Sequence, residues 1–249
     1  RYPPPMCGRI VQITSPEEIA REFGAPLDPA LSGGSVADTR VVRAVWQPRW
    51  NLAPSLPALV VRGRVEMAMW GMSARWQTAR TGGLFNARAE TVEKLPSFRD
   101  AYKKGRLVVP IDAFYEWENP EHLAELGRPL PKRAPKQPWA FLPAAGGRFA
   151  LAAIGADRPD GAFGFSLITT QANGVVGRIH DRMPVILPNG DAIGTWLDPD
   201  AHRDDLAELL GPLPDERVAT RRVSRRVSNA RNEGPECLVE APVEGLGLV

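Results

Sequence analysis

The sequence predicts an α+β fold, in which a single domain is built on a curved, barrel-like and mostly antiparallel β-sheet with helices on its flanks. Three observations lead to this prediction. Apolar runs rich in β-branched residues recur along the chain. Two pairs of such runs are separated by a glycine-centred turn, which is typical of β-hairpins. Helical patterns are fewer and do not alternate regularly with strands, which argues against a doubly wound parallel sheet.

The first predicted element is a helix over residues 16–23. Ser15 suits the N-cap, Pro16 suits the first helical position, and Glu18 closes a capping box. Residues 24–57 follow with many glycines and prolines and little periodicity. We therefore expect an irregular connection there, with one short strand at 41–45.

Strands dominate the middle of the chain. The runs ALVV and VEMAMW flank Arg62-Gly63-Arg64 as a hairpin, and WAFLPAAGGRFALAAIG repeats that design around Gly146-Gly147. The runs RLVVPIDAFYEW (106–117) and FSLITT (165–170) are apolar enough for buried strands.

Two further helices are predicted, at 91–104 with an interruption at Pro96, and at 201–210 with an end at Gly211. Residues 119–138 are polar and proline-rich, which predicts a mobile surface insertion that touches none of the candidate catalytic residues. No internal repeat or linker is evident, so we expect one domain over 1–249, in which residues 1–5 are a leader or an expression remnant.

The composition fits a soluble, globular protein of the cytosol. The chain has 249 residues and 43% hydrophobic content, which is enough to bury a core. No stretch approaches the roughly 18 uninterrupted apolar residues of a membrane helix, and the N-terminus lacks the apolar core of a signal peptide. The two cysteines, Cys7 and Cys237, lie far apart in sequence, which argues against a disulfide framework and a cysteine-rich zinc site.

Arginine is concentrated near the C-terminus. The net charge is only +2, yet residues 217–232 hold six arginines and no acidic residue. Arginine is well suited to bidentate phosphate binding. Solvated surface positions, in a chain shaped by a GC-rich genome, explain the same pattern, so both interpretations stay open.

Four short stretches combine reactive and hydrogen-bonding residues: MCGR (6–9), NARAET (86–91), FYEW (114–117) and HDRMP (180–184). None is a zinc, P-loop or dinucleotide motif, so neither a metal nor a cofactor is predicted. A cysteine with a histidine and a carboxylate suggests nucleophilic catalysis, although a lone cysteine is more often a small buried hydrophobic residue.

The position of Cys7 suggests a more specific chemistry. If translation starts at Met6 and that methionine is removed, Cys7 acquires a free α-amine next to its thiol. Such a 1,2-aminothiol condenses with an aldehyde to an imine, and the thiol then closes a five-membered thiazolidine. Neither group achieves this alone.

Taken together and in order, these motifs resemble the SOS response-associated peptidase family, also called abasic-site processing proteins. The resemblance runs from MCGR through RWNLAPS, WGM, NARAET, FYEW and HDRMPVIL to VSRRVSNARNEGPE, roughly residues 6–236. It implies a DNA-damage response protein that binds single-stranded DNA and crosslinks to the ring-opened aldehyde of an abasic site through an N-terminal cysteine.

The resemblance also implies roles for four catalytic residues. Cys7 would be the covalent residue, and Asn86 would position the cysteine amine and the sugar. Glu116 would act as the acid and base, and His180 would handle the deoxyribose hydroxyl proton. Each residue type suits its task, because imine formation and dehydration need a proton donor and acceptor within hydrogen-bond reach.

Seven further residues are implied in DNA binding. Three arginines match the phosphate-binding positions, two residues would offer apolar surface to the bases beside the lesion, and two are further candidates. The arginines are Arg9, Arg88 and Arg182. The residues with apolar surface are Pro54 and Trp70, and the further candidates are Asn51 and Thr169.

Structural explanations compete with several of these roles. Trp70 and Trp117 suit a partly buried position, because aromatic residues on strands usually pack in the core. Asn86 could terminate a strand, and His180 could be a surface histidine. We assign the remaining cysteine and histidines to structure or surface: Cys237, His122 and His202.

The chain departs from the family pattern at its start. Arg1-Tyr2-Pro3-Pro4-Pro5 precede Met6, and a Cys7 whose nitrogen is in a peptide bond cannot form a thiazolidine. We expect these residues to be an expression remnant, a misassigned start, or a segment removed by autoproteolysis. Ala113 also replaces the glycine that the family usually has before FYEW.

Three functions remain open at this point. The first is an abasic-site crosslinking protein, with strand-cleaving lyase activity as a side reaction of the imine. The second is a cysteine peptidase with Cys7 as nucleophile and His180 as base. The third is a non-catalytic DNA-binding module, which would bind DNA in a salt-dependent way without a covalent product. The expected partner is single-stranded DNA with abasic sites, no membrane contact is expected, and we expect a cytoplasmic, nucleoid-associated monomer.

Overall fold

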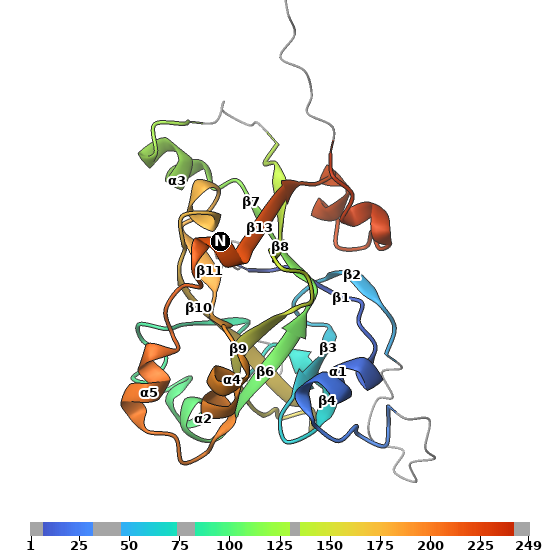
Figure 1. Ribbon diagram of the computed structural model, residues 1–249, viewed down its shortest axis with the longest axis vertical. Helices are drawn as coiled ribbons and strands as arrows, with labels where there is room; N and C mark the ends of the chain where they lie inside the picture. The colour runs from blue at the N-terminus through green and yellow to red at the C-terminus, as the bar shows by residue number, and fades with distance from the viewer. Residues whose placement is uncertain (1–6, 32–45, 74–82, 130–134, 242–249) are drawn as a thin grey trace, which may run out of the picture.

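Five strands form a closed barrel in the computed structural model, which describes residues 7–31, 46–73, 83–129 and 135–241 (Figure 1). The strands follow the order β10, β4, β3, β6, β9, and β9 pairs again with β10 to close the ring. All neighbours in the ring are antiparallel except β10 and β4, which are parallel. The five are β3 (Pro57–Val61), β4 (Val65–Trp70), β6 (Arg106–Ile111), β9 (Phe149–Asp157) and β10 (Phe163–Gln171).

Three short strands extend the barrel. The end of β10 pairs in parallel with β5 (Asn86–Arg88) and antiparallel with β11 (Arg182–Pro184), and β12 (Ile186–Leu187) pairs with β9. Consequently β5 and β11, which both carry candidate site residues, are held together by the end of one strand.

A second sheet lies against the barrel and forms the other half of the molecule (Figure 1). All its pairings are antiparallel. In spatial order its strands are β13 (Val218–Arg222), β8 (Pro138–Pro143), β7 (Ala113–Trp117), β1 (Ile10–Gln12) and β2 (Arg49–Leu52).

Three apolar clusters stabilise these layers. One fills the barrel and joins it to the second sheet through Phe114, Phe141 and Phe149. Another covers the outside of the barrel under α1 (Pro16–Phe23), α2 (Arg99–Lys104), α4 (Gly190–Leu197) and α5 (Arg203–Glu208). A third lies on the outer face of the second sheet, beneath the 3₁₀ turns η3 (Arg225–Ser228) and η4 (Pro235–Cys237). Two further 3₁₀ turns are η1 (Val176–Arg178) and η2 (Asp215–Arg217).

The fold class and several elements agree with the sequence-based predictions. Helix α1 has the predicted bounds, and the Ser15 side chain accepts a hydrogen bond from the Glu18 N–H. The hairpin of β3 and β4 is also confirmed, with Gly63 in the left-handed region at the turn (φ 70°). No helix of the described ranges has the length and apolar character needed to cross a bilayer. Cys7 and Cys237 are both free thiols.

The buried strands expected in 106–117 are confirmed, whereas the hairpin expected around Gly146-Gly147 was wrong; at both places the chain passes from one sheet to the other. Residues 106–117 form β6 in the barrel and β7 in the second sheet, and the Asp112 carboxylate at the break accepts hydrogen bonds from the N–H groups of Ile13 and Thr14. The turn at Gly146-Gly147 likewise links β8 to β9 across the two sheets, so these strands do not pair with each other.

The helix predictions were partly wrong. Residues 91–98 form turns, so only Arg99–Lys104 of the 91–104 prediction is helical, which is consistent with the break expected at Pro96. Residues 24–57 include the unpredicted β2, whereas the strand expected at 41–45 falls outside the described residues. The 119–138 insertion begins with an ordered helix, α3 (Pro120–Glu125), whose Leu123 is fully buried.

Candidate functional site

Cys7 and Glu116 meet where β1 and β7 lie side by side. Cys7 precedes β1, Glu116 lies on β7, and the register pairs Ile10 with Phe114. The Cys7 backbone N donates a hydrogen bond to the Glu116 Oε1 at 2.6 Å. Both residues are buried, and Cys7 adopts a positive φ of 51°, which is uncommon for a residue other than glycine. The fold therefore places a carboxyl group directly against the nitrogen of Cys7.

Burial controls the protonation of this pair. Burial raises the pKa of the Cys7 thiol well above its usual value, and the neighbouring Glu116 charge raises it further, while Arg182 opposes the shift. Burial also raises the pKa of Glu116, whereas His180 and the hydrogen bonds with Cys7 lower it. The neutral thiol is therefore favoured, and Glu116 is shifted toward the range in which a carboxyl group can both donate and accept a proton.

His180 is fixed through its Nδ1 atom. This nitrogen lies 3.1 Å from the Arg182 backbone N and 3.1 Å from the Asp181 Oδ1. The two contacts suit different protonation states, because a neutral Nδ1 accepts from the Arg182 N–H and a protonated Nδ1 donates to Asp181. In both states Nδ1 is engaged, so Nε2 is the nitrogen that remains for proton transfer.

The insertion holds the loop that carries His180 through contacts with the neighbours of that residue. Asn119 donates from its backbone N to the Ile179 carbonyl at 3.0 Å and from its Nδ2 to the Asp181 Oδ1 at 3.2 Å. In α3, the His122 Nε2 lies 2.6 Å from the Gly177 carbonyl oxygen. His180 is thus supported from both neighbouring residues.

Arg182 is buried beside this loop and already has an acidic partner. Its guanidinium contacts the Glu90 carboxylate through two nitrogens, at 2.5 and 3.0 Å. It also donates to the Thr169 carbonyl at 2.7 Å, so the buried Thr169 orients Arg182. The hydrogen bond from Arg182 lowers the pKa of Glu90. A phosphate would therefore have to share Arg182 with Glu90. Arg88 lies on β5, opposite Thr169 of β10, and is exposed.

Arg9 and Asn51 form a second group. The Arg9 NH1 donates to the Asn51 Oδ1 and to the Val227 carbonyl, both at 2.9 Å, and the Arg9 guanidinium lies 5.7 Å from the centre of the Trp117 ring. Asn51 has no exposed surface, so its role is to hold Arg9 and the C-terminal segment.

The remaining candidates differ in accessibility. Trp70 has no exposed surface, stacks on Phe165 and donates from its indole N to the Phe85 carbonyl. It therefore belongs to the core and not to a base-facing surface, which agrees with the structural alternative. Pro54 and Asn86 are half-buried, and Asn86 pairs with Leu167 in the β5–β10 ladder.

Three residues of this site were not predicted from the sequence: Glu90, Asn119 and Asp181. Glu90 and Asp181 lie inside the quoted motifs, so proximity in sequence was the available signal. Asn119 precedes Pro120, and its side chain accepts from the N–H groups of Glu121 and His122 as the N-cap of α3. This Asn-Pro pair is a recognisable helix start.

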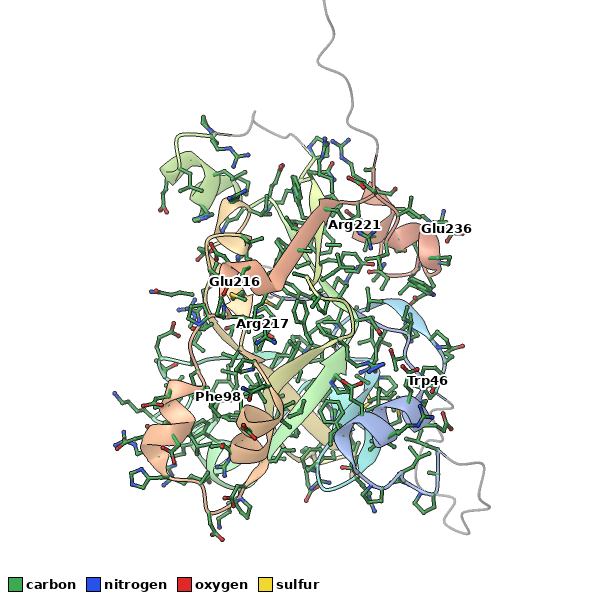
Figure 2. All side chains as sticks on the ribbon, viewed as in Figure 1. Trp46, Phe98, Glu216, Arg217, Arg221 and Glu236 are labelled. Atoms are coloured by element: carbon green, nitrogen blue, oxygen red, sulfur yellow. The ribbon has the colours of Figure 1, made fainter. Side chains whose placement is uncertain are left out.

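No cluster of metal-ligating side chains occurs within the described ranges. A hollow of about 580 Å³ lies between α4, the β8–β9 turn and the start of β13, where Figure 2 labels Glu216 and Arg217. None of the predicted site residues lines it. The candidate site is instead the surface where the second sheet meets β5, β10 and β11.

The barrel, the flanking sheet and the Cys-Glu-His grouping define the class of protein. The chain belongs to the SOS response associated peptidase (SRAP) family, whose model matches residues 6–230.

Relatives and solved structures agree with this assignment. The chain is 30% identical over 245 residues to the abasic site processing protein YoqW of Bacillus subtilis, which covers 94% of this chain and 99% of the relative. It is 27% identical to the abasic site processing protein YedK of Escherichia coli, with the same coverage of both chains. A crystal structure of a Bacteroides thetaiotaomicron protein shares the fold, with a TM-score of 0.74, 21% identity and coverage of 94% of this chain and all of that one.

Proposed function

We propose that this protein processes abasic sites in DNA as part of the DNA-damage response. We further propose that it binds single-stranded DNA and joins Cys7 to the abasic aldehyde as a thiazolidine. The names of its SRAP relatives support abasic-site processing. The 2.6 Å contact between the Cys7 nitrogen and the Glu116 carboxylate carries the chemical proposal, because a peptidase nucleophile has no need of a carboxyl group at its backbone nitrogen.

The proposed reaction has three steps. The free α-amine of Cys7 adds to the aldehyde carbon, and the amine proton passes through Glu116 to the oxygen. Glu116 then donates a proton as the hydroxyl leaves as water and takes back the remaining proton of the nitrogen, which forms the imine. Finally the thiol sulfur bonds to the imine carbon and its proton moves to the nitrogen. One water is lost overall, and a Cys7 nitrogen freed from its peptide bond is required at the outset.

The other site residues act on the sugar and the strand. His180 exchanges the proton of the deoxyribose hydroxyl through Nε2, and Asn86 positions the sugar and the amine. Before the thiazolidine ring closes, the imine can lose a C2′ proton and expel the 3′ phosphate as a C2′=C3′ double bond forms, which gives strand cleavage as a side reaction. Arg9 and Arg88 contact phosphates, and Arg182 contacts a phosphate while it stays paired with the Glu90 carboxylate.

A cysteine peptidase has less support. A peptidase nucleophile works as a thiolate, and burial raises the pKa of the Cys7 thiol. The group next to Cys7 is a carboxyl group, whose charge further disfavours the thiolate. Self-cleavage before Cys7 stays within the proposal as one route to the free amine.

Mass spectrometry tests the proposed function. A chain that begins at Cys7 is incubated with an oligonucleotide containing one abasic site, and we expect an adduct equal to both masses minus one water. Cys7→Ala should form only an imine that borohydride trapping reveals. The chain that retains residues 1–6 is the matched control, because its nitrogen is blocked. The mass of the adduct shows whether residues 1–6 are still attached. A stable adduct that retains residues 1–6, or no adduct from the Cys7-start chain, would refute the proposal.

A further inference from the structure

The arginine-rich C-terminal segment presents three unpaired cations. Arg225, Arg226 and Arg231 are exposed, and none forms an ion pair with a carboxylate of the described ranges. Two other arginines of the same segment have polar partners, since Arg217 donates to the Pro188 carbonyl and Arg222 to the Gln137 Oε1. We name the three exposed residues, Arg225, Arg226 and Arg231, the arginine shelf.

The backbone beneath the shelf is held in place by a buried amide. The Asn51 Nδ2 lies 3.1, 3.0 and 2.9 Å from the carbonyl oxygens of Val227, Asn229 and Asn232. Val227 itself is fully buried against the outer face of the second sheet. The shelf arginines therefore project from an ordered support, so that binding a ligand would restrict only their side chains.

The shelf adjoins the candidate site through Arg9 and Trp117. Arg9 contacts the Val227 carbonyl and lies over the Trp117 ring, and the Trp117 indole N donates to the Ser228 Oγ at 2.9 Å. Trp117 is half-buried and directly follows Glu116. Successive side chains of a strand face opposite sides of the sheet, so Trp117 lies on the outer face with the shelf. Arg9, two residues after Cys7, links this face to the candidate site through its contacts with Val227 and Trp117.

Nearby acidic residues do not neutralise the shelf. The Glu233 carboxylate accepts from the Arg49 side chain at 2.7 Å and from the backbone N–H groups of Trp50 and Asn51. Glu236 is exposed on η4 and lines the same hollow as Arg225, but no ion pair joins Glu236 to a shelf arginine in the described part of the chain. Three guanidinium groups next to a half-exposed indole match the chemistry of single-stranded nucleic acid, which offers phosphates and bases in alternation.

We propose that the arginine shelf binds the phosphates of the DNA strand that continues from the abasic nucleotide past Trp117. This inference rests on the proposed function for the identity of the ligand. It extends the contact surface beyond the reacting nucleotide, to one side of the lesion. It also gives the arginine-rich segment a role that the four catalytic motifs do not supply.

Salt dependence of binding tests the shelf. The probe is an undamaged, fluorescently labelled single-stranded oligonucleotide of about 15 nucleotides. Each phosphate contact contributes about 0.7 to the slope of log affinity against log salt concentration, so replacing all three arginines with glutamine should lower the slope by about 2. The matched control replaces Lys94, Lys103 and Lys104, all exposed, with glutamine. Replacing these lysines removes the same charge near α2, far from the red C-terminal segment that holds the shelf in Figure 1. The slope of the lysine variant should stay within error of wild type.

Shortening the probe gives a second readout. Two short oligonucleotides are compared, one with an abasic site near its 5′ end and one with the site near its 3′ end. Wild type should bind one of the two more tightly, and the shelf variant should bind both equally. An unchanged slope in the shelf variant, or an equal loss in the lysine control, would overturn the inference.

The two proposals fail separately in these assays. If the Cys7-start chain forms no adduct but the shelf variant loses its salt slope, the shelf stands as a nucleic-acid contact and the crosslinking proposal falls. If the adduct forms and the slope does not change, the shelf falls alone.

Discussion

Replacing Glu116 with glutamine should make the protein more stable and less reactive. Glutamine keeps the size of the side chain and an oxygen that can accept from the Cys7 nitrogen, but it cannot ionise. Glu116 is only 4% exposed, so its charged form lacks the water that an exposed carboxylate has. The E116Q substitution removes the cost of that buried charge.

The sign and size of the effect follow from proton linkage. Burial raises the pKa of Glu116 in the folded state above the usual value of 4.5, so the folded protein holds this proton more tightly than the unfolded chain does. The resulting stability is fully present below the unfolded pKa and is lost as the pH rises through the folded pKa. Each unit of difference between the two pKa values is worth about 1.4 kcal/mol, or roughly 3–6 °C in Tm for a chain of this length.

Thermal unfolding of the blocked chain, with residues 1–6 attached, measures this effect. E116Q should melt above wild type near pH 8, and the difference should shrink toward zero at about pH 4, below the unfolded pKa. Glu118→Gln, at a half-buried position two residues along, is the matched control and should show no such trend. In the Cys7-start chain, E116Q should slow adduct formation by about 10²–10⁴-fold. A variant that melts below wild type near pH 8, or a difference independent of pH, would refute the reasoning.

Two other variants test how the site and the fold are supported. Asn119→Asp keeps an oxygen that can cap α3 but loses the amide donor to the Asp181 carboxylate. We expect little change in Tm, adduct formation slowed by roughly tenfold, and a shift in its pH profile, because a second carboxylate then lies beside Asp181. The neutral Asn119→Ser, which also keeps an oxygen for the cap, should not reproduce that shift. Arg106→Met removes a buried guanidinium that donates to the carbonyls of Tyr102, Trp196 and Asp198. Urea unfolding should show a loss of about 3 kcal/mol, whereas the adduct rate should stay that of wild type.

The sequence was sufficient to predict elements that depend on local signals. Helix α1 depends on a capping serine and an N-terminal proline, and the β3–β4 hairpin depends on a glycine turn between two apolar runs. The closure of the barrel could not be predicted in the same way, because the parallel β10–β4 pairing and the crossing at Asp112 are set by tertiary packing. A continuous apolar run such as 106–117 satisfies both sheets equally, so periodicity alone cannot locate the point where the chain passes between them.

The candidate site shows the same division. Glu116 and His180 were named from the resemblance to the family, and Cys7 also from its position after Met6; the structure brings Cys7 and Glu116 into contact. Their supporting partners depend on geometry that no motif encodes. Asn119 reaches Asp181 across 62 positions, and Arg182 reaches Glu90 across 92. The aromatic ring of Trp70 suits base stacking by type. It packs in the barrel core instead, because Trp70 lies on the inward-facing side of β4.

The burial that disfavours a peptidase is compatible with the proposed crosslink. A peptidase requires a thiolate, which a buried cysteine beside a carboxyl group resists forming. The proposed thiazolidine formation begins at the amine and requires proton transfers at nitrogen and oxygen, for which a carboxyl group of raised pKa is suited. The thiol reacts last, with an imine carbon that is already electrophilic, and it passes its proton to the nitrogen that Glu116 contacts. In the proposed reaction, the same buried environment would keep the thiol protonated until the imine has formed and would then let it close the ring.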